Sequence, residues 1–136
     1  MKELNQLYKQ GYLQGHSQGC RCKRADLQRS FAMSLSQDLA KLTNGFKEAG
    51  KQHGFNLVVS GEPALFYLRI ANDDSLMLHQ EWIAECVSRG LFLASHHNHF
   101  MNAAVTDDDI KLAIDIAEDA FSVVAKRHPE MPGLIK

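Results

Sequence analysis

The feature that most constrains the fold is a helix start encoded at Thr106. A threonine at this cap accepts a hydrogen bond from the third helical amide while Asp109 reaches back to the cap, which makes a capping box. The three aspartates over 107–109 also complement the positive end of the helix dipole. Apolar residues then recur on one helical face, namely Ile110, Ile114, Ala117, Phe121 and Val124. The sequence therefore predicts an amphipathic helix to about Arg127, docked on a core and ending before Pro129.

A second apolar stripe predicts a longer helix earlier in the chain. Its members recur at steps of three or four residues: Leu27, Phe31, Leu35, Leu39, Leu42 and Phe46. The pattern begins near Ala25, and Gly50 and Gly54 are stop signals at its end. We expect this stripe to be buried in the core. A short helix around Leu4 to Tyr8 is also indicated.

Three runs are typical of strands. Residues 56–60 and 64–70 are separated by Gly61-Glu62-Pro63, which predicts a hairpin, and the run at 91–94 predicts a third strand. In the second strand, apolar side chains alternate onto one face: Ala64, Phe66, Leu68 and Ile70. A helix capped by Asp74 or Ser75, with Cys86 in its buried stripe, should end at Gly90. The expected fold is α+β, with a small three- to four-stranded sheet covered by helices.

Length and charge narrow the function. At 136 residues the chain has room for one domain, expected over 25–128, between a poorly defined segment at 1–24 and a tail at 129–136. A formal net charge of -1 gives no global field to attract nucleic acid or an anionic membrane, so neither is an expected partner. The opening MKELNQLYKQ resembles no signal peptide, and three cysteines read as reduced thiols. We expect a cytoplasmic protein.

The loop before Thr106 holds the densest group of ring nitrogens, from His96 to His99. His97 and His99 project to the same side of an extended chain and could share a metal ion, whereas His96 points away. Imidazole and amide side chains at a strand end also form hydrogen bonds with backbone N–H and C=O groups that no strand partner satisfies. This structural role is favoured for His99. A second soft-ligand group, His16, Cys20 and Cys22, lacks the spacing of common zinc motifs.

The stretch GLFLASHHNHFMNAAVTDDDIKLAIDIAEDAF resembles the C-terminal signature of class III aminotransferases of the glutamate-1-semialdehyde aminomutase type. The matching residues are Arg89, Gly90, His97, Asn98, Phe100, Ala104, Thr106, Asp109 and Ile110. The departures are Ser95, His99, Asn102 and Val105, where the family pattern has proline, tryptophan, serine and histidine. The resemblance spans roughly residues 31–126 and implies the small C-terminal domain of a fold-type I pyridoxal phosphate (PLP) enzyme.

In that family the catalytic lysine and the PLP-binding groups belong to a large domain that precedes this one. The resemblance therefore implies no catalytic residue, no bound cofactor and no activity on this chain alone, and a large PLP-binding domain as partner in cis or in trans. It implies substrate-side roles for His97 and Asn98, with His96, His99 and Arg69 secondary. Arg69 has the chemistry of a carboxylate clamp, although a solvated strand-end arginine is the commoner case. The alternatives are a metal-binding module using His97 and His99, or a homodimerising module.

Overall fold

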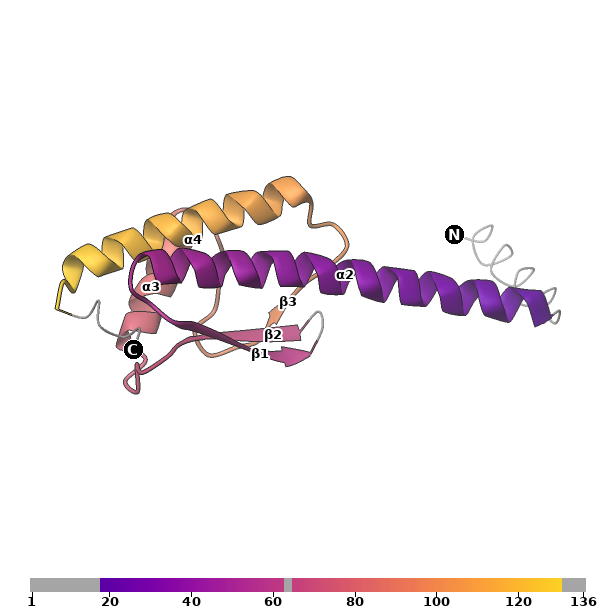
Figure 1. The fold of residues 1–136 in the computed structure, drawn as a ribbon, viewed down its shortest axis with the longest axis horizontal. Coiled ribbons are helices and arrows are strands. Elements are labelled where there is room, and N and C mark those ends of the chain that lie inside the picture. Colours follow the sequence, from indigo (N-terminus) through magenta and orange to yellow (C-terminus); the bar gives the residue numbers. More distant parts are fainter. Residues whose placement is uncertain (1–17, 63–64, 131–136) are drawn as a thin grey trace, which may run out of the picture. The chain divides into compact units, whose positions relative to one another are not determined.

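The computed structural model describes residues 18–62 and 65–130, with side chains from residue 24 onward. Within them the elements are α2 (Gln18–Gln52), β1 (Leu57–Glu62), β2 (Leu65–Ile70), α3 (Met77–Ser88), β3 (His99–Phe100) and α4 (Asp107–Arg127), as drawn in Figure 1. The expected helix near Leu4 and the side chains of His16, Cys20 and Cys22 lie outside the described part. The chain divides into two units between Ser34 and Leu35. The fold and the site described below belong to the second unit.

The sheet is antiparallel throughout, in the order β1-β2-β3. The hairpin is confirmed: Leu57 lies opposite Ile70, and Glu62 opposite Leu65. Phe66, Leu68 and Ile70 are all buried, because alternate residues of β2 face the core. Ala64, expected on the same face, lies outside the described residues. The prediction of an α+β fold with a small sheet and flanking helices is thus correct.

The predicted strand at 91–94 is wrong. These residues form a loop, and the third strand is instead the pair His99–Phe100, bonded to Leu65 and Phe66 of β2. Leu93 is buried by packing, and the Ala94 amide donates to the ring of His99 rather than to a strand. An apolar run becomes a strand only when its backbone groups meet another strand, and here the chain meets β2 five residues later.

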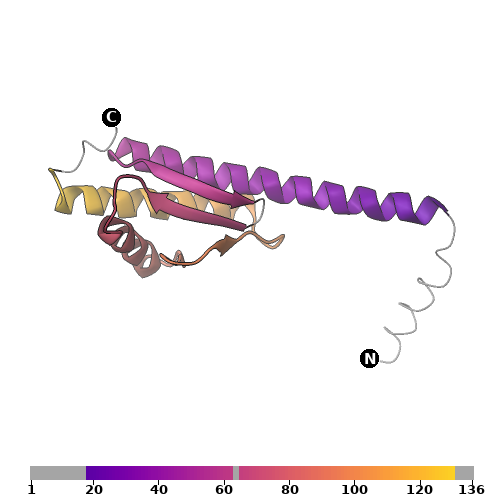
Figure 2. The same ribbon diagram turned by 90° about the horizontal axis from the view of Figure 1, so that it is seen from below.

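The C-terminal part of α2 packs on α4. Figures 1 and 2 show these two helices running alongside each other with the sheet on one side of the pair. The two helices approach closely at Gly45, where a Cβ would lie 2.2 Å from Cδ1 of the Ile114 side chain. The expected burial of the α2 stripe is correct only for this part: Phe46 is fully buried and Leu42 partly. Residues Leu27 and Phe31 are 73% and 53% exposed, so that end of the stripe is not core.

An aromatic cluster forms the centre of the core. The Trp82 and Phe121 rings stack with centroids 4.6 Å apart, and Phe55 stacks on the other side of the group at 5.3 Å from Phe121. Phe46 meets Trp82 edge-on at 6.3 Å. The indole N–H donates to the Ala117 carbonyl at 3.3 Å, so burial leaves no unpaired donor on the tryptophan. The cluster ties α2, α3 and α4 to one another.

The two helix starts differ. At α4 the predicted capping box is present, with Asp109 N–H donating to Thr106 Oγ1 at 3.2 Å and Thr106 N–H to Asp109 Oδ2 at 2.9 Å. At α3 the predicted cap by Asp74 or Ser75 is wrong, because Leu76 takes the cap position in a left-handed conformation without a side-chain cap bond. The buried Asp73 accepts the His79 N–H at 2.8 Å, and Ser75 Oγ accepts the Met77 N–H at 3.3 Å from outside the cap position.

At its C-terminal end, α3 is followed by Gly90 with a positive φ of 96°, as predicted. Among the described residues, none of the helices is both long and apolar enough to pass through a bilayer.

Candidate functional site

The residues predicted to contact a ligand lie on the loop between α3 and α4, which the sheet holds at two points. The Tyr67 hydroxyl of β2 donates to the Ser95 carbonyl at 3.0 Å. Strand β3 pairs with β2 at Phe66 and His99. Between these anchors the chain turns at His96 and His97, whose side chains are exposed, as is Asn98. The loop therefore presents three polar side chains in a row from a fixed base.

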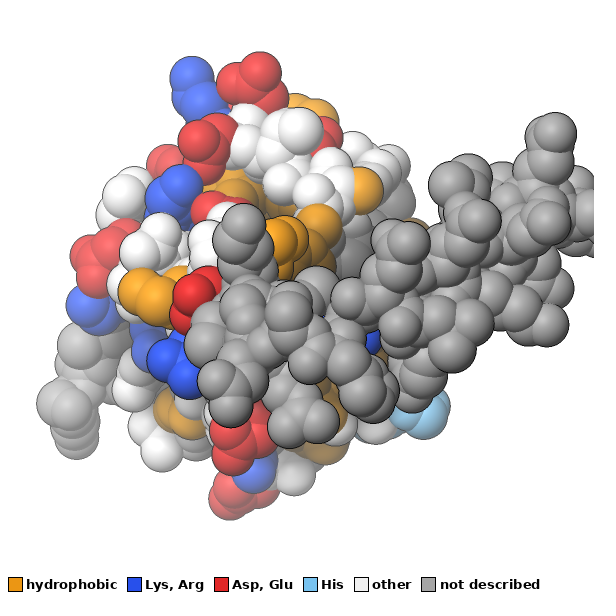
Figure 3. All heavy atoms as spheres, turned by 90° about the vertical axis from the view of Figure 1, so that its right-hand side faces the viewer, with side chains coloured by type: hydrophobic (Ala, Val, Ile, Leu, Met, Phe, Trp, Pro, Cys, Tyr) orange, Lys and Arg blue, Asp and Glu red, His pale blue; other side chains and the backbone are white. Residues whose placement is uncertain are grey.

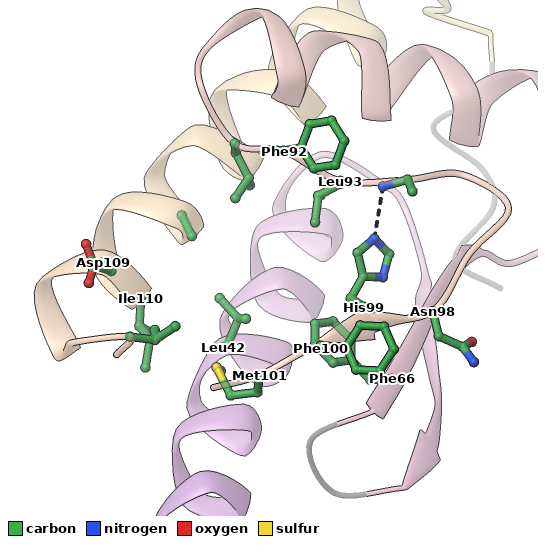
Figure 4. A pocket seen from close by; sticks show the side chains of 14 residues that line it. Leu42, Phe66, Phe92, Leu93, Asn98, His99, Phe100, Met101, Asp109 and Ile110 are labelled. Atoms are coloured by element: carbon green, nitrogen blue, oxygen red, sulfur yellow. Dashed lines mark hydrogen bonds between the residues drawn. The ribbon is translucent and has the colours of Figure 1, made fainter. Parts of the chain in front are cut away.

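His99 is one of the residues that hold the loop. Its ring stacks on Phe66 with centroids 5.2 Å apart, and the amide N–H of Ala94 donates to Nε2 at 3.1 Å (Figure 4). An accepting Nε2 carries no proton, so this geometry requires the neutral ring. Burial lowers the pKa of His99 below its usual value, with the Phe66 backbone opposing the shift. The hydrogen bond from Ala94 to His99 therefore closes the loop formed by residues 94–99.

This geometry bears on the metal-binding alternative. Nε2 of His99 is occupied by the Ala94 amide, and Nδ1 is buried without a hydrogen-bond partner in the described part. His97 lies two residues before His99, and its side chain is exposed. A shared ion would have to displace the Ala94 bond or enter a closed space. Among the described side chains, no group of three or more histidine, cysteine or acidic residues is placed to hold a metal.

Beside the loop lies an apolar cavity of about 450 Å³, which sequence reasoning missed. Its walls come from α2, β2, the 91–105 loop and the first turns of α4, and the lining residues include Leu42, Phe66, Phe92, Phe100, Met101, Val105 and Ile110. Figure 4 labels all of these except Val105. Asn98, His99 and Asp109 are the polar lining residues. The volume is in the range of pockets that hold ligands or anchoring side chains.

The rim of the cavity carries two large exposed aromatic residues. Phe92 is 84% and Phe100 77% exposed, although both line the cavity. Figure 3 views the molecule from the side of β3 and the start of α4, and shows hydrophobic side chains in a hollow among polar ones. Phe92 and Phe100 are eight residues apart in the sequence, and only the fold brings them to one apolar patch of the kind that marks interaction sites.

The structure separates Arg69 from the other predicted contacts. Arg69 lies on β2 three residues beyond Phe66, about 10 Å along the strand. Its side chain is 46% exposed and lies 3.7 Å from the Asp74 carboxylate. His96 and His97 also lie outside the cavity lining, whereas Asn98 is part of it. The four predicted residues therefore do not form a single cluster around the cavity.

A second buried histidine was missed. His79 is fully buried on α3, next to Trp82, and neither ring nitrogen has a partner among the described residues. Burial lowers its pKa below the usual value, while the Asp73 carboxylate acts in the opposite direction. Its helical spacing with Ile83 and Cys86 could have indicated the buried position. Burial also raises the pKa of Cys86 to about 12, which keeps that thiol protonated, as expected of a core residue.

The described residues do not fit a PLP site of their own. PLP is held by a Schiff-base lysine, an acidic partner for the ring nitrogen and phosphate-binding donors. The cavity lining contains neither lysine nor arginine. Lys41 pairs instead with Asp38 and Asp107, at 3.3 Å and 2.7 Å, and Lys51 with Glu48 at 2.6 Å. No catalytic step through the cofactor can be derived from these residues.

Comparisons with known proteins confirm the resemblance drawn from the sequence. No protein-family model matches the chain. An aminopentol aminotransferase of Sphingopyxis macrogoltabida is 29% identical over 87 residues, which is 64% of this chain and 21% of that protein. A glutamate-1-semialdehyde 2,1-aminomutase of Psychrobacter arcticus is 26% identical over 143 residues, covering 90% of this chain and 33% of that protein.

A solved structure shares the fold. The PLP internal aldimine form of the FumI protein of Sphingopyxis sp. MTA144 matches with a TM-score of 0.66 and 26% identity, over 76% of this chain and 26% of that one. The chain thus spans about a fifth to a third of the length of the curated relatives it matches. It is similar to one part of PLP-dependent aminotransferases and aminomutases, and its α+β fold occurs in an enzyme of that kind.

Proposed function

We propose that this chain, which resembles part of a PLP-dependent aminotransferase, acts as the C-terminal small domain of a class III, glutamate-1-semialdehyde aminomutase-like protein. The observation that carries the proposal is the shared fold with the PLP-bound FumI protein at a TM-score of 0.66 over 76% of this chain. A large PLP-binding domain, in cis or in trans, is the partner. The chain would add one wall to a cofactor site that the partner supplies.

In this proposal the chain has no aminotransferase activity by itself. Amino transfer depends on PLP, which when bound acts as the electron sink for the reaction. The lysines with described ion pairs, Lys41 and Lys51, point into surface networks with carboxylates. Both side chains are more than half exposed, whereas a lysine amine is activated by desolvation in an apolar pocket or by a neighbouring cation. The contribution of the chain is binding and orientation rather than chemistry.

The loop between α3 and α4 is the part of the chain that meets the substrate. His97 and Asn98 are exposed on a base fixed by Tyr67 and His99, so they can donate or accept hydrogen bonds without a large ordering cost. His96 is a second-rank contact on the same turn. Arg69 remains a candidate clamp for a substrate carboxylate, but only for one that extends along β2.

A cytoplasmic location is part of the proposal. Cys86 is a free, buried cysteine. A reduced thiol agrees with the reducing compartment that the three cysteines of the sequence suggested.

The test compares two samples: the purified recombinant chain, and tagged protein isolated from the cells in which the chain naturally occurs. We expect the purified recombinant chain to remain colourless with added PLP and to transfer no amino group. We expect material isolated through a tag from the native cells to carry an aldimine absorption band, from a longer polypeptide or a second one. In that material, His97→Ala and Asn98→Ala should raise KM more than they lower kcat, while the exposed control Met77→Ala changes neither. Transamination by the recombinant chain, or native material free of PLP, would contradict the proposal.

A further inference from the structure

We propose that His99 acts as a pH-dependent switch for the loop formed by residues 94–99, which stays closed while the imidazole is neutral and opens when Nε2 binds a proton. The loop forms part of the wall of the apolar cavity, because Ala94, Asn98 and His99 line it. The inference concerns the conformation of this loop and does not depend on PLP or on a large domain.

The switch depends on one hydrogen bond. The Ala94 N–H donates to Nε2 of His99 at 3.1 Å, a bond that needs the lone pair of an unprotonated nitrogen (Figure 4). A proton on Nε2 turns the acceptor into a donor, so two N–H groups would then point at each other. The closed loop and the protonated ring are therefore incompatible, and the Ala94 amide moves away when His99 becomes charged.

Few other contacts hold this part of the chain. Among the described residues, no backbone–backbone hydrogen bond involves positions 94–97. The Tyr67 hydroxyl donates to the Ser95 carbonyl at 3.0 Å, while the side chains of His96 and His97 are already exposed. Opening breaks the bond to His99 and exposes little further surface, so it is a local event that leaves the core packed.

The groups around His99 determine the protonation state of the closed loop. Burial lowers the pKa of His99, and the Phe66 backbone opposes this shift. His79 faces it from α3, and a charge on His99 disfavours a second charge on His79. Asp109 of α4 lines the same cavity, but its carboxylate accepts hydrogen bonds from the N–H and the hydroxyl of Thr106. The part of α2 that lines the cavity is apolar. The closed loop therefore keeps the ring of His99 neutral.

The buried ring of His79 lies next to the same loop but is not the switch. Asp73 and the Ser95 backbone favour its protonated form, whereas His96 and His99 disfavour it. A charge on His79 is thus stabilised by the Ser95 backbone of the closed loop, which gives it no reason to open the loop. The bond that protonation breaks belongs to His99.

The size of the effect follows from the difference in protons bound. In the closed loop the pKa of His99 lies below its ordinary value of 6.5, whereas in the open loop water reaches the ring and its pKa returns toward 6.5. The closed loop is therefore fully favoured above pH 6.5, and this preference weakens as the pH falls toward the closed-state pKa. At about pH 5.5 the ratio of open to closed loop rises by up to about tenfold over its value at neutral pH.

The experiment is amide hydrogen exchange of the full chain by NMR, with the protection factor of the Ala94 amide measured between about pH 7.5 and about pH 5.5. We expect this factor to fall by up to about tenfold, with the same midpoint as the titration of the His99 ring nitrogens. About 1 M urea should leave it unchanged because local opening exposes little surface. The amide of the buried Val124 exchanges through unfolding and should respond to urea.

Two variants isolate the cause. His99→Gln keeps an acceptor for the Ala94 amide and has no ring to titrate, so its Ala94 protection should not depend on pH. The matched control is His97→Ala, which removes an exposed imidazole and should keep the wild-type pH dependence. A wild-type Ala94 protection that is constant over this range, that falls equally in His99→Gln, or that responds to urea as Val124 does would overturn the proposal.

The wild-type midpoints decide the case in which glutamine fails to protect the Ala94 amide at any pH. Coincidence of the Ala94 midpoint with that of the His99 ring then supports the switch. An Ala94 midpoint that follows the ring of His79 or His96 instead overturns it.

Discussion

The hydrogen bond between His99 and Ala94 gives a quantitative prediction about the loop. In His99→Ala the Ala94 amide loses its acceptor, and an amide left unpaired in a partly buried place costs about 1–2 kcal/mol. The stack on Phe66 is lost as well, at a further cost of about 0.5–1 kcal/mol. We therefore expect the free energy of unfolding to fall by about 1.5–3 kcal/mol, measured by urea denaturation above the ordinary histidine pKa of 6.5.

Two further variants isolate the cause. His97→Ala removes an exposed imidazole two residues away and should change stability by less than about 0.5 kcal/mol. His99→Gln keeps an oxygen that can accept from the Ala94 amide, so it should lose clearly less than His99→Ala. Equal losses for the alanine and glutamine variants would mean that the hydrogen bond contributes nothing.

The same bond makes stability depend on pH. The pKa values of His99 and His79 are lowered by burial, so in the folded protein both rings stay neutral at a pH where the unfolded chain binds protons. The contribution of the two neutral histidines to the free energy of unfolding is therefore complete above pH 6.5. It decreases as the pH falls toward their pKa values in the folded protein. The slope is at most about 1.4 kcal/mol per pH unit for each histidine.

The glutamine variant tests this assignment. His99→Gln carries no titratable ring at 99, so it should keep only the share of the acid loss that belongs to His79. The measurement is the unfolding free energy at several pH values between the ordinary histidine and glutamate pKa values, 6.5 and 4.5. The lowered pKa of Glu81 adds its own loss only below that window, as its bonds to Arg127 and His128 are broken. A His99→Gln variant with the full wild-type slope would refute the reasoning.

Three other substitutions test the fold, each by urea denaturation. Gly61→Ala should cost about 2 kcal/mol or more, because Gly61 has a φ of 117° and a Cβ there would lie 2.3 Å from the Leu65 carbonyl oxygen; a loss below about 0.5 kcal/mol would show that the hairpin can adjust. Thr106→Ala should cost about 1 kcal/mol through loss of the cap of α4, with Thr106→Ser as the near-neutral control. Phe121→Ala should cost about 3–5 kcal/mol, since the ring is fully buried between two stacked aromatics; a cost like that of the exposed Leu112→Ala would contradict this core.

Several features of the fold were readable because their causes are local. The capping box needs only Thr106 and Asp109 at the right spacing, and both of its hydrogen bonds are present. The hairpin follows from two β-prone runs and the turn residues between them, and Gly90 ends α3 as a glycine with positive φ. The resemblance to class III aminotransferases also rested on contiguous residues, and relatives of that kind were found.

Other features were not readable because they depend on contacts between distant residues. The run at 91–94 has the composition of a strand, but β2 pairs with His99 and Phe100 instead. The cap of α3 failed for a similar reason, because the acceptor comes from the buried Asp73 once Leu76 has turned left-handed. The sequence shows which residues can donate or accept, whereas the folded chain decides which of them meet.

By itself the sequence determined the helices α2, α3 and α4, the hairpin and the family resemblance. Those features arise from periodicity, turn chemistry and short-range hydrogen bonds, which act within a few residues. Only the tertiary structure decided that Phe46 is core while Phe31 is exposed, although both lie on one helical stripe. It alone placed Phe92 and Phe100 around a cavity and turned His99 into a loop anchor. Burial and pairing are properties of what lies opposite a residue, and in this chain the opposite side is supplied by segments tens of residues away.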